Sequence, residues 1–291
     1  MKSLAAWLTG CVLLPACCVF TKGNVNVADP AKGLTLVERL EAETPALVWW
    51  NDGEGHHTYN SEEATNAYRF VPYCGAVWLT ADTMLTAEHC VDDIGRPAKT
   101  VTEDTDDDDG DDETDGPIQE LQELLQQVQE LKDQMTAWTP VGQTVLYSNR
   151  ADIDPQHNNY HTGKVFAVDM LNDLALIKAD GPDSHPVANL RVGPIHDGEE
   201  LHIIGNPAGG WWTYEHGYVA AERPQYWDGK HWRPVTQVSA PVFFGNSGGG
   251  AYDASGNLIG IADAVNPKIP ETAFFVPRDV IRGFLTANRV P

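Results

Sequence analysis

Short runs of apolar and β-branched residues recur along most of this chain of 291 residues, separated by Gly, Pro, Asn and Asp. Such runs are typical of antiparallel strands joined by tight turns, so they predict an all-β barrel or sandwich. Asp228-Gly229, between two of the runs, indicates a hairpin. The expected strands lie at 46–50, 75–80, 83–86, 144–147, 164–168, 174–178, 201–205, 214–221, 235–239, 249–252, 258–264 and 273–276.

One internal segment departs from this pattern. Apolar residues at 117–138 recur in steps of three and four, which predicts an amphipathic helix of about 20 residues. It follows ten carboxylates between Glu103 and Asp115, a self-repelling block typical of a solvated loop. We therefore expect an insertion at 101–138, whose helix packs on the body or joins a second copy in an oligomer. Clustered carboxylates suit Ca²⁺, but this block lacks EF-hand spacing, so no metal is assigned.

The chain is acidic, with 42 Asp and Glu against 19 Lys and Arg, for a formal net charge of −23. Proteins that bind phosphate backbones need basic surface, so the composition argues against nucleic acid as a partner.

The first 16 residues predict a signal peptide. Lys2 precedes an apolar stretch of about 13 residues, which is too short to span a bilayer. The stretch ends in Leu14-Pro15-Ala16-Cys17, which resembles a bacterial lipobox whose cysteine is acylated. We expect export to the periplasm or beyond, with lipidated Cys17 as the one membrane contact; plain secretion and a cytosolic N-terminal helix are the alternatives. Residues 17–45 are expected to form a linker and 46–291 the folded domain.

Cysteine usage agrees with export. Only Cys74 and Cys90 lie beyond the signal region. Two remaining cysteines in an exported chain favour one disulfide, and two unpaired buried thiols are the alternative.

Three polar strings supply what a hydroxyl nucleophile needs. Thr86-Ala87-Glu88-His89-Cys90 offers a base, Asn172-Asp173 opens an apolar strand with a carboxylate, and Gly245-Asn246-Ser247-Gly248 sets a hydroxyl among glycines. Each string alone also fits a structural histidine, a turn aspartate or a flexible or anion-binding loop. Their order, His then Asp then Ser, matches the chymotrypsin order and excludes the subtilisin and α/β-hydrolase orders. Asp169 is a nearby rival acid.

Over 46–285 the chain resembles the trypsin-like serine proteases. Cys74-Gly75-Ala76-Val77-Trp78-Leu79 and the later Leu85-Thr86-Ala87-Glu88-His89-Cys90 look like the cysteine-bracketed histidine segment of that family, with Glu88 in place of the usual alanine. The strings at 201–207, 217–219 and 273–279 are closer to bacterial Deg-type members, although we expect no PDZ module here. The spacing from His89 to Asp173 exceeds the chymotrypsin pattern by about the length of the 101–138 insertion.

The resemblance implies a fold and a set of roles. The fold would be two six-stranded antiparallel β-barrels, with the site in the cleft between them. Independently of the resemblance, the helical spacing of apolar residues at 278–285 predicts a C-terminal helix. His89 would be the general base, Asp173 its orienting acid and Ser247 the nucleophile, with the N–H groups of Gly245 and Ser247 as the oxyanion hole. The family also joins the cysteines that correspond to Cys74 and Cys90.

Specificity and activation are harder to predict. Asn246 stands where trypsin has the Asp that pairs with a new N-terminus, so we expect no activating cleavage. No acid occupies the trypsin position that selects Lys or Arg, which favours a small or apolar side chain before the cleaved bond. Asp263 is expected to face solvent, whereas an inward Asp263 would favour a basic one. The expected pocket walls are Val242, Phe243, Phe244, Ile261, Ala262 and Asp263.

The sequence therefore predicts an exported serine endopeptidase that acts on protein or peptide substrates through an acyl-enzyme, with no cofactor. A serine esterase of the same fold is one alternative. Another is a protease-fold binding or adhesion module with inert chemistry. Its binding surface would use the helix or the aromatic residues Trp211, Trp212, Tyr214, Tyr218, Tyr226, Trp227 and Trp232.

Overall fold

The computed structural model describes the chain in eight stretches and one single residue. These are 33–51, 57–58, 69–92, 94, 139–153, 159–181, 184–227, 231–266 and 268–291. The expected signal peptide, the lipidation site Cys17 and the 101–138 insertion with its helix lie outside the described residues, and they stay predictions.

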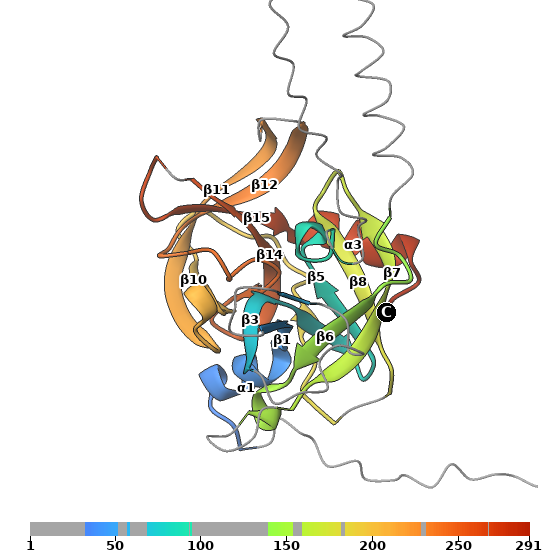
Figure 1. Cartoon of the computed structure of the whole chain (residues 1–291). Helices are drawn as coiled ribbons and strands as arrows, with labels where there is room; N and C mark the ends of the chain where they lie inside the picture. The colour runs from blue at the N-terminus through green and yellow to red at the C-terminus, as the bar shows by residue number, and fades with distance from the viewer. Residues whose placement is uncertain are drawn as a thin grey trace, which may run out of the picture.

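Eight strands from the first half of the chain form an open antiparallel barrel (Figure 1). Their order is β2-β1-β6-β7-β8-β5-β4, and β3 also pairs with β1. Strand β8 is buried on both faces, since Leu174 and Leu176 belong to one apolar cluster and Ile177 to another. The strands are β1 (Ala46–Asn51), β2 (His57–Thr58), β3 (Arg69–Gly75), β4 (Val77–Thr80), β5 (Thr83–Thr86), β6 (Thr144–Ser148), β7 (His161–Asp169) and β8 (Leu174–Ala179).

The second half of the chain forms a closed barrel. Six strands run in the order β13-β10-β11-β12-β15-β14, and β14 pairs back with β13, so the sheet has no free edge along this path. The short β9 adds to β14 in parallel. The strands are β9 (Asn189–Leu190), β10 (Glu200–Gly205), β11 (Thr213–Trp227), β12 (Trp232–Ser239), β13 (Gly250–Tyr252), β14 (Asn257–Val265) and β15 (Thr272–Pro277). The predicted all-β architecture of two barrels is confirmed, with one barrel closed and one open.

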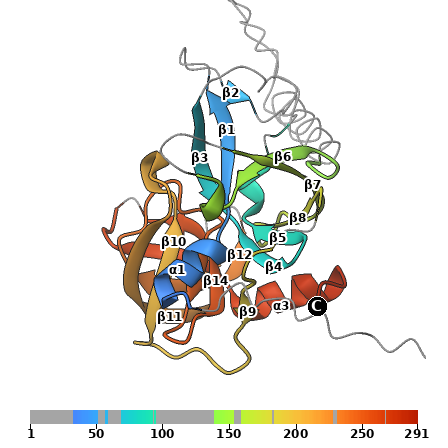
Figure 2. The same ribbon diagram turned by 90° about the horizontal axis from the view of Figure 1, so that it is seen from below.

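Within the described residues, two α-helices pack on this framework. The predicted C-terminal helix is α3 (Arg278–Ala287) (Figure 2). It buries Ile281, Phe284 and Leu285. The stretch expected to be a linker contributes α1 (Leu36–Glu43), which a Thr35–Glu38 capping box opens. Leu40 of α1 is fully buried, so the folded unit begins earlier than position 46. Among the described residues, no helix is long and apolar enough to cross a membrane.

One apolar cluster joins the two barrels. It contains Leu146 and Leu174 from the first barrel and Ile204, Tyr252 and Ile261 from the second. Close packing of this kind holds the barrels in one relative position. Loops from the two barrels that meet at the junction are therefore held in fixed positions relative to each other.

Candidate active site

His89 lies at the end of the first-barrel strand β5, in the short helical turn η1 (Glu88–Cys90). Its side chain is 46 % exposed, whereas that of Asp173 is 13 % exposed. One oxygen of Asp173 accepts a hydrogen bond from the backbone N–H of His89, and the other lies 2.8 Å from His89 Nδ1. Because an ionised carboxylate only accepts, Nδ1 carries the proton and Nε2 is left to accept one.

The two groups shift each other's pKa. Burial tends to lower the pKa of His89, but the hydrogen bond and negative charge of Asp173 outweigh it, so the pKa lies above its usual value. Burial tends to raise the pKa of Asp173, but the hydrogen bond and charge of His89 hold it below its usual value. The arrangement therefore stabilises an imidazolium at His89, which is what a general base must become during the reaction.

A tight turn between β7 and β8 presents Asp173. Its φ of 55° lies in the left-handed region, which Asp tolerates better than most residues. Asp169 closes this turn, since its carboxylate accepts hydrogen bonds from the backbone N–H and the side-chain Nδ2 of Asn172. The rival acid thus holds the turn, and Asp173 is the acid that meets His89.

Ser247 belongs to the second barrel, and glycines bring its backbone against the first. The N–H of Gly75 donates to the carbonyl of Ser247 at 2.8 Å. A Cβ on Gly248, whose φ is 76°, would lie 2.2 Å from Oγ1 of Thr86, three residues before His89. In the described part of the chain the Ser247 hydroxyl makes no hydrogen bond, and such bonds are often long before substrate binds.

The backbone beside Ser247 contains the two N–H groups that were predicted to form an oxyanion hole. Gly245 has a φ of 103°, and a Cβ there would lie 2.2 Å from the carbonyl oxygen of Asn206, so only glycine fits. The N–H of Asn246 donates to the carbonyl of Phe243. Within the described residues, the N–H groups of Gly245 and Ser247 have no hydrogen-bond acceptor, so they remain as two donors beside the hydroxyl.

Two polar residues that the sequence did not single out hold this loop. Asn206 is fully buried and donates from Nδ2 to the carbonyl of Cys74, which ties the two barrels together. Glu215 of β11 accepts from Nδ2 of Asn246 at 3.0 Å, and burial raises the pKa of Glu215. Because Asn246 stands where trypsin has an Asp, its side-chain amide needs a hydrogen-bond acceptor within the protein. The sequence does not identify the residue that accepts this bond.

The expected pocket residues separate into two groups. Phe243 and Phe244 are 55 % and 70 % exposed and contact each other edge to face. Val242 is partly buried, whereas Ile261 and Ala262 are buried in the core. Their assignment as pocket walls stays a prediction.

The expectation that Asp263 faces solvent is wrong. Its side chain is 5 % exposed and lies 2.6 Å from Nη1 of the buried Arg233. A β-bulge between Ala262 and Ala264 interrupts the alternation of side chains between the two faces of β14, and so changes the direction of Asp263. The pattern of apolar and polar residues in the sequence does not reveal this bulge. Arg233 lies two residues before the buried Val235 of β12, so both side chains lie on the same face of that strand. A buried arginine needs a nearby acid, and this spacing was the signal in the sequence.

Two clusters near the site have metal-binding residue types. Cys74 and Cys90 are joined in a disulfide, so their sulfurs are not free to bind a metal with His89. Donor atoms of His89, Asp173 and Asp263 lie within 4.8 Å of one another, but Asp263 is paired with a cation and His89 Nδ1 with a carboxylate. We assign no metal to either cluster.

The predicted disulfide, Cys74–Cys90, is present and flanks His89. Replacing both cysteines by serine is expected to lower the free energy of unfolding by about 3 kcal/mol, because the unfolded chain regains the entropy of the closed loop. Urea unfolding of the oxidised protein and the double variant measures this. Dithiothreitol should lower the stability of the parent and leave the variant unchanged. Equal midpoints for parent and variant would contradict it.

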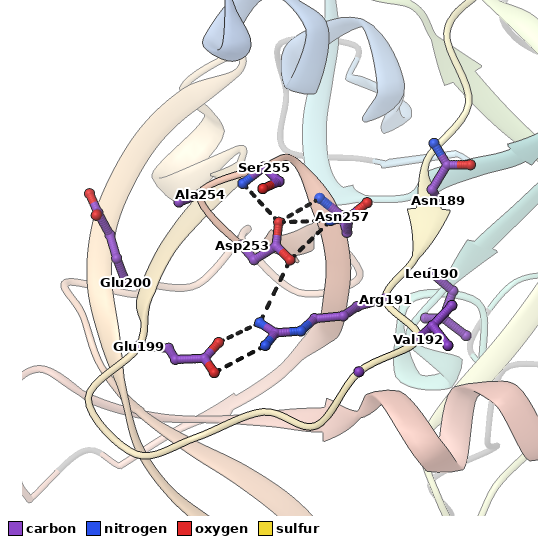
Figure 3. Close-up of a pocket in the computed structure, with 11 residues that line it drawn as sticks. Asn189, Leu190, Arg191, Val192, Glu199, Glu200, Asp253, Ala254, Ser255 and Asn257 are labelled. Atoms are coloured by element: carbon purple, nitrogen blue, oxygen red, sulfur yellow. Dashed lines mark hydrogen bonds and ion pairs between the residues drawn. The ribbon is translucent and has the colours of Figure 1, made fainter.

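A polar pocket of about 740 Å³ lies apart from these residues (Figure 3). Arg191 forms ion pairs with Glu199 and Asp253 across it. Asp253 also accepts from the backbone N–H groups of Ser255 and Asn257. Arg191 is thus shared between two carboxylates of this pocket, and none of His89, Asp173 and Ser247 lines it.

The aromatic residues of the second barrel do not form one surface. Trp212 is buried, and its indole N–H donates to the carbonyl of Thr44. Trp227 and Trp232 are exposed and face each other across the predicted β11–β12 hairpin. These positions fit packing and hairpin pairing better than a continuous binding groove.

Solved structures share this fold. An HtrA-type protease, AlgW with tripeptide, matches with a TM-score of 0.55 at 19 % identity, over 88 % of this chain and 62 % of that one. The Rv3671c protease from M. tuberculosis, active form, matches with a TM-score of 0.53 at 14 % identity, over 86 % and 82 %. These likenesses concern the fold.

Proteins with similar sequences include several that are named as proteases. Protease Do-like 1, chloroplastic, from Arabidopsis thaliana is 32 % identical over 42 % of this chain and 30 % of its own length. A probable periplasmic serine endoprotease DegP-like from Hahella chejuensis is 29 % identical over 41 % and 26 %. The match spans less than a third of the length of each of these relatives. The model of the trypsin-like peptidase domain matches residues 74–261, more than half of the chain. The chain therefore belongs to the family of trypsin-like peptidase domains.

Proposed function

We propose that this chain is a serine endopeptidase of the Deg type, with His89, Asp173 and Ser247 as its triad. The observation that carries the proposal is the double hydrogen bond from His89 to Asp173, which leaves Nε2 as the base. The docking of the Ser247 backbone on Gly75, in the same part of the junction, supports it.

In this proposal the reaction proceeds through an acyl-enzyme. Ser247 Oγ attacks the peptide carbonyl while His89 Nε2 takes its proton, and the resulting oxyanion accepts from the N–H groups of Gly245 and Ser247. His89 then gives the proton to the leaving amine, and a water molecule repeats the sequence to release the acid. Loss of one such oxyanion donor typically costs about 3–4 kcal/mol in transition-state stabilisation.

The proposed substrates are proteins or peptides with a small or apolar side chain before the cleaved bond. The burial of Asp263 against Arg233 supports this, because it withholds from the substrate the acid that would have selected Lys or Arg. The exposed Phe243 and Phe244 are available to contact an apolar side chain. A periplasmic DegP-like relative supports export of this chain, and lipidation of Cys17 and oligomerisation through 117–138 remain parts of the proposal.

A fluorophosphonate probe tests the chemistry. We expect the unprocessed full-length chain to be labelled, with the label on Ser247 by peptide mapping, because Asn246 has the internal partner Glu215 and needs no new N-terminus. Absence of labelling would favour an inert binding module. Labelling only after internal cleavage would contradict the expectation about activation.

A peptide library then tests specificity. We expect cleavage after Ala, Val or Leu to exceed cleavage after Lys or Arg by at least roughly tenfold, which is the usual effect of about one or two methylene-sized contacts. The same library with ester bonds separates a peptidase from an esterase. A preference for basic residues would show that Asp263 is accessible to substrate and would contradict this proposal.

A further inference from the structure

A buried contact between an aspartate and an arginine lies beside the proposed triad. Asp263 of β14 and Arg233 of β12 have side chains that are 5 % and 8 % exposed, and Asp263 Oδ2 approaches Arg233 Nη1 to 2.6 Å. Buried charges persist in proteins when they are paired, and a pair held next to reacting groups changes their electrostatics.

Asp263 also lies close to the acid of the proposed triad. Side-chain oxygens of Asp263 and Asp173 and a ring nitrogen of His89 lie within 4.8 Å of one another. Two carboxylate charges held this close in a buried site repel each other, which favours a proton on one of them. Asp173 already accepts two hydrogen bonds from His89, which favour its ionised form. The proton therefore belongs on Asp263.

A β-bulge gives Asp263 this orientation. The pairing of β14 with β15 shifts register between Ala262 and Ala264, so Asp263 is the extra residue. Bulges next to active sites commonly redirect a side chain in this way. The β15 residues at this level, Phe274 and Phe275, carry no charge. The titratable or charged groups that act on Asp263 are Asp173 from the β7–β8 turn, His89 from η1 and Arg233 from β12.

We propose that Asp263 is a positioning residue for the peptidase reaction, a neutral acid that donates a hydrogen bond to Asp173 and holds that carboxylate against His89. The inference rests on the proposed function of the site. Arg233 fixes the other side of the Asp263 carboxyl group. When Asp263 ionises, the donor is lost and two anions are left in contact, so Asp173 turns away from His89 and activity falls.

The pKa of Asp263 supports this arrangement. Burial and, after it, the charge of Asp173 raise the pKa of Asp263 to about 7, against the lowering effect of Arg233. Because the pKa is raised, Asp263 stays neutral in acid and loses its proton as the pH rises through neutrality. The pH profile of kcat/KM should therefore rise as His89 deprotonates and fall as Asp263 ionises.

Three variants test the proposal. Asp263→Asn keeps a donor that cannot ionise, so kcat should fall only about threefold and the alkaline fall should disappear. Asp263→Ala removes the donor, so kcat should fall about tenfold to a hundredfold with little change in KM, as expected for a lost hydrogen bond to a charged group. Arg233→Met removes the cation that favours ionisation, so the alkaline fall should move to higher pH. Arg223→Met on β11, an exposed arginine bonded to Gln237, is the matched control and should match the parent.

The outcomes are separable. A parent profile without an alkaline fall, or one that Asp263→Asn leaves unchanged, would overturn the proposal. Equal losses of activity and of thermal stability in Asp263→Asn and Asp263→Ala would show a purely structural pair and would also overturn it. If the parent neither reacts with the fluorophosphonate nor cleaves peptide, the proposed function has failed. The low-field NMR signal of the His89 Nδ1 proton then tests Asp263 alone: it should change through neutral pH in the parent and stay constant in Asp263→Asn.

Discussion

Ser247→Ala is expected to lower kcat for peptide hydrolysis by about a million-fold, because it removes the hydroxyl that the proposed mechanism uses to form the acyl-enzyme. Substrate binding should change little, since the backbone donors of Gly245 and Ser247 remain. Thermal stability should also be kept, because the Ser247 hydroxyl makes no hydrogen bond among the described residues. Steady-state kinetics and an unfolding curve measure both.

Ser255→Ala provides the matched control. Ser255 lies in the β13–β14 turn. Its backbone N–H donates to Asp253 and its carbonyl accepts from Arg39, and both bonds remain when the side chain is replaced. This variant should keep parental kcat and labelling. Substantial hydrolysis by Ser247→Ala would mean that the nucleophile lies elsewhere, and the proposed triad would be wrong.

Asp173→Asn is expected to lower kcat by about ten-thousand-fold at neutral pH. The amide Nδ2 of the new side chain would donate to His89 Nδ1, which moves the ring proton to Nε2 and removes the base. The pKa of His89 should fall as well, because the Asp173 charge is what holds it up. The pH profile of kcat/KM and NMR titration of His89 measure these effects. In the parent, activity should be lost as the pH falls through a His89 pKa above its usual value.

Asp169→Asn separates Asp173 from its rival. Asp169 fixes the turn through Asn172 and does not contact His89, so we expect a loss of less than about tenfold, from a looser turn. The pKa of His89 should not move. A large loss in Asp169→Asn together with a small loss in Asp173→Asn would exchange the roles of the two acids.

Local patterns predicted much of the fold. Short apolar runs between turn residues correspond to strands such as β8 and β10, and helical spacing near the C-terminus corresponds to α3. The hairpin at Asp228-Gly229 and the disulfide at Cys74 were also predicted. The strands, the helix and the hairpin depend on residues that are close in the sequence, and two remaining cysteines can form only one disulfide. The sequence pattern is therefore enough to predict them.

The sequence alone determined which side chains are available for chemistry and in what order: a histidine after a strand, an aspartate before one, and a serine among glycines. Only the tertiary structure decided that Asp263 lies near Asp173, that Arg233 lies against Asp263 and that Glu215 accepts from Asn246. The physical reason is that a bulge and two curled sheets set the direction of these side chains. A side chain's direction across a sheet depends on the register with a partner strand, which no local pattern contains.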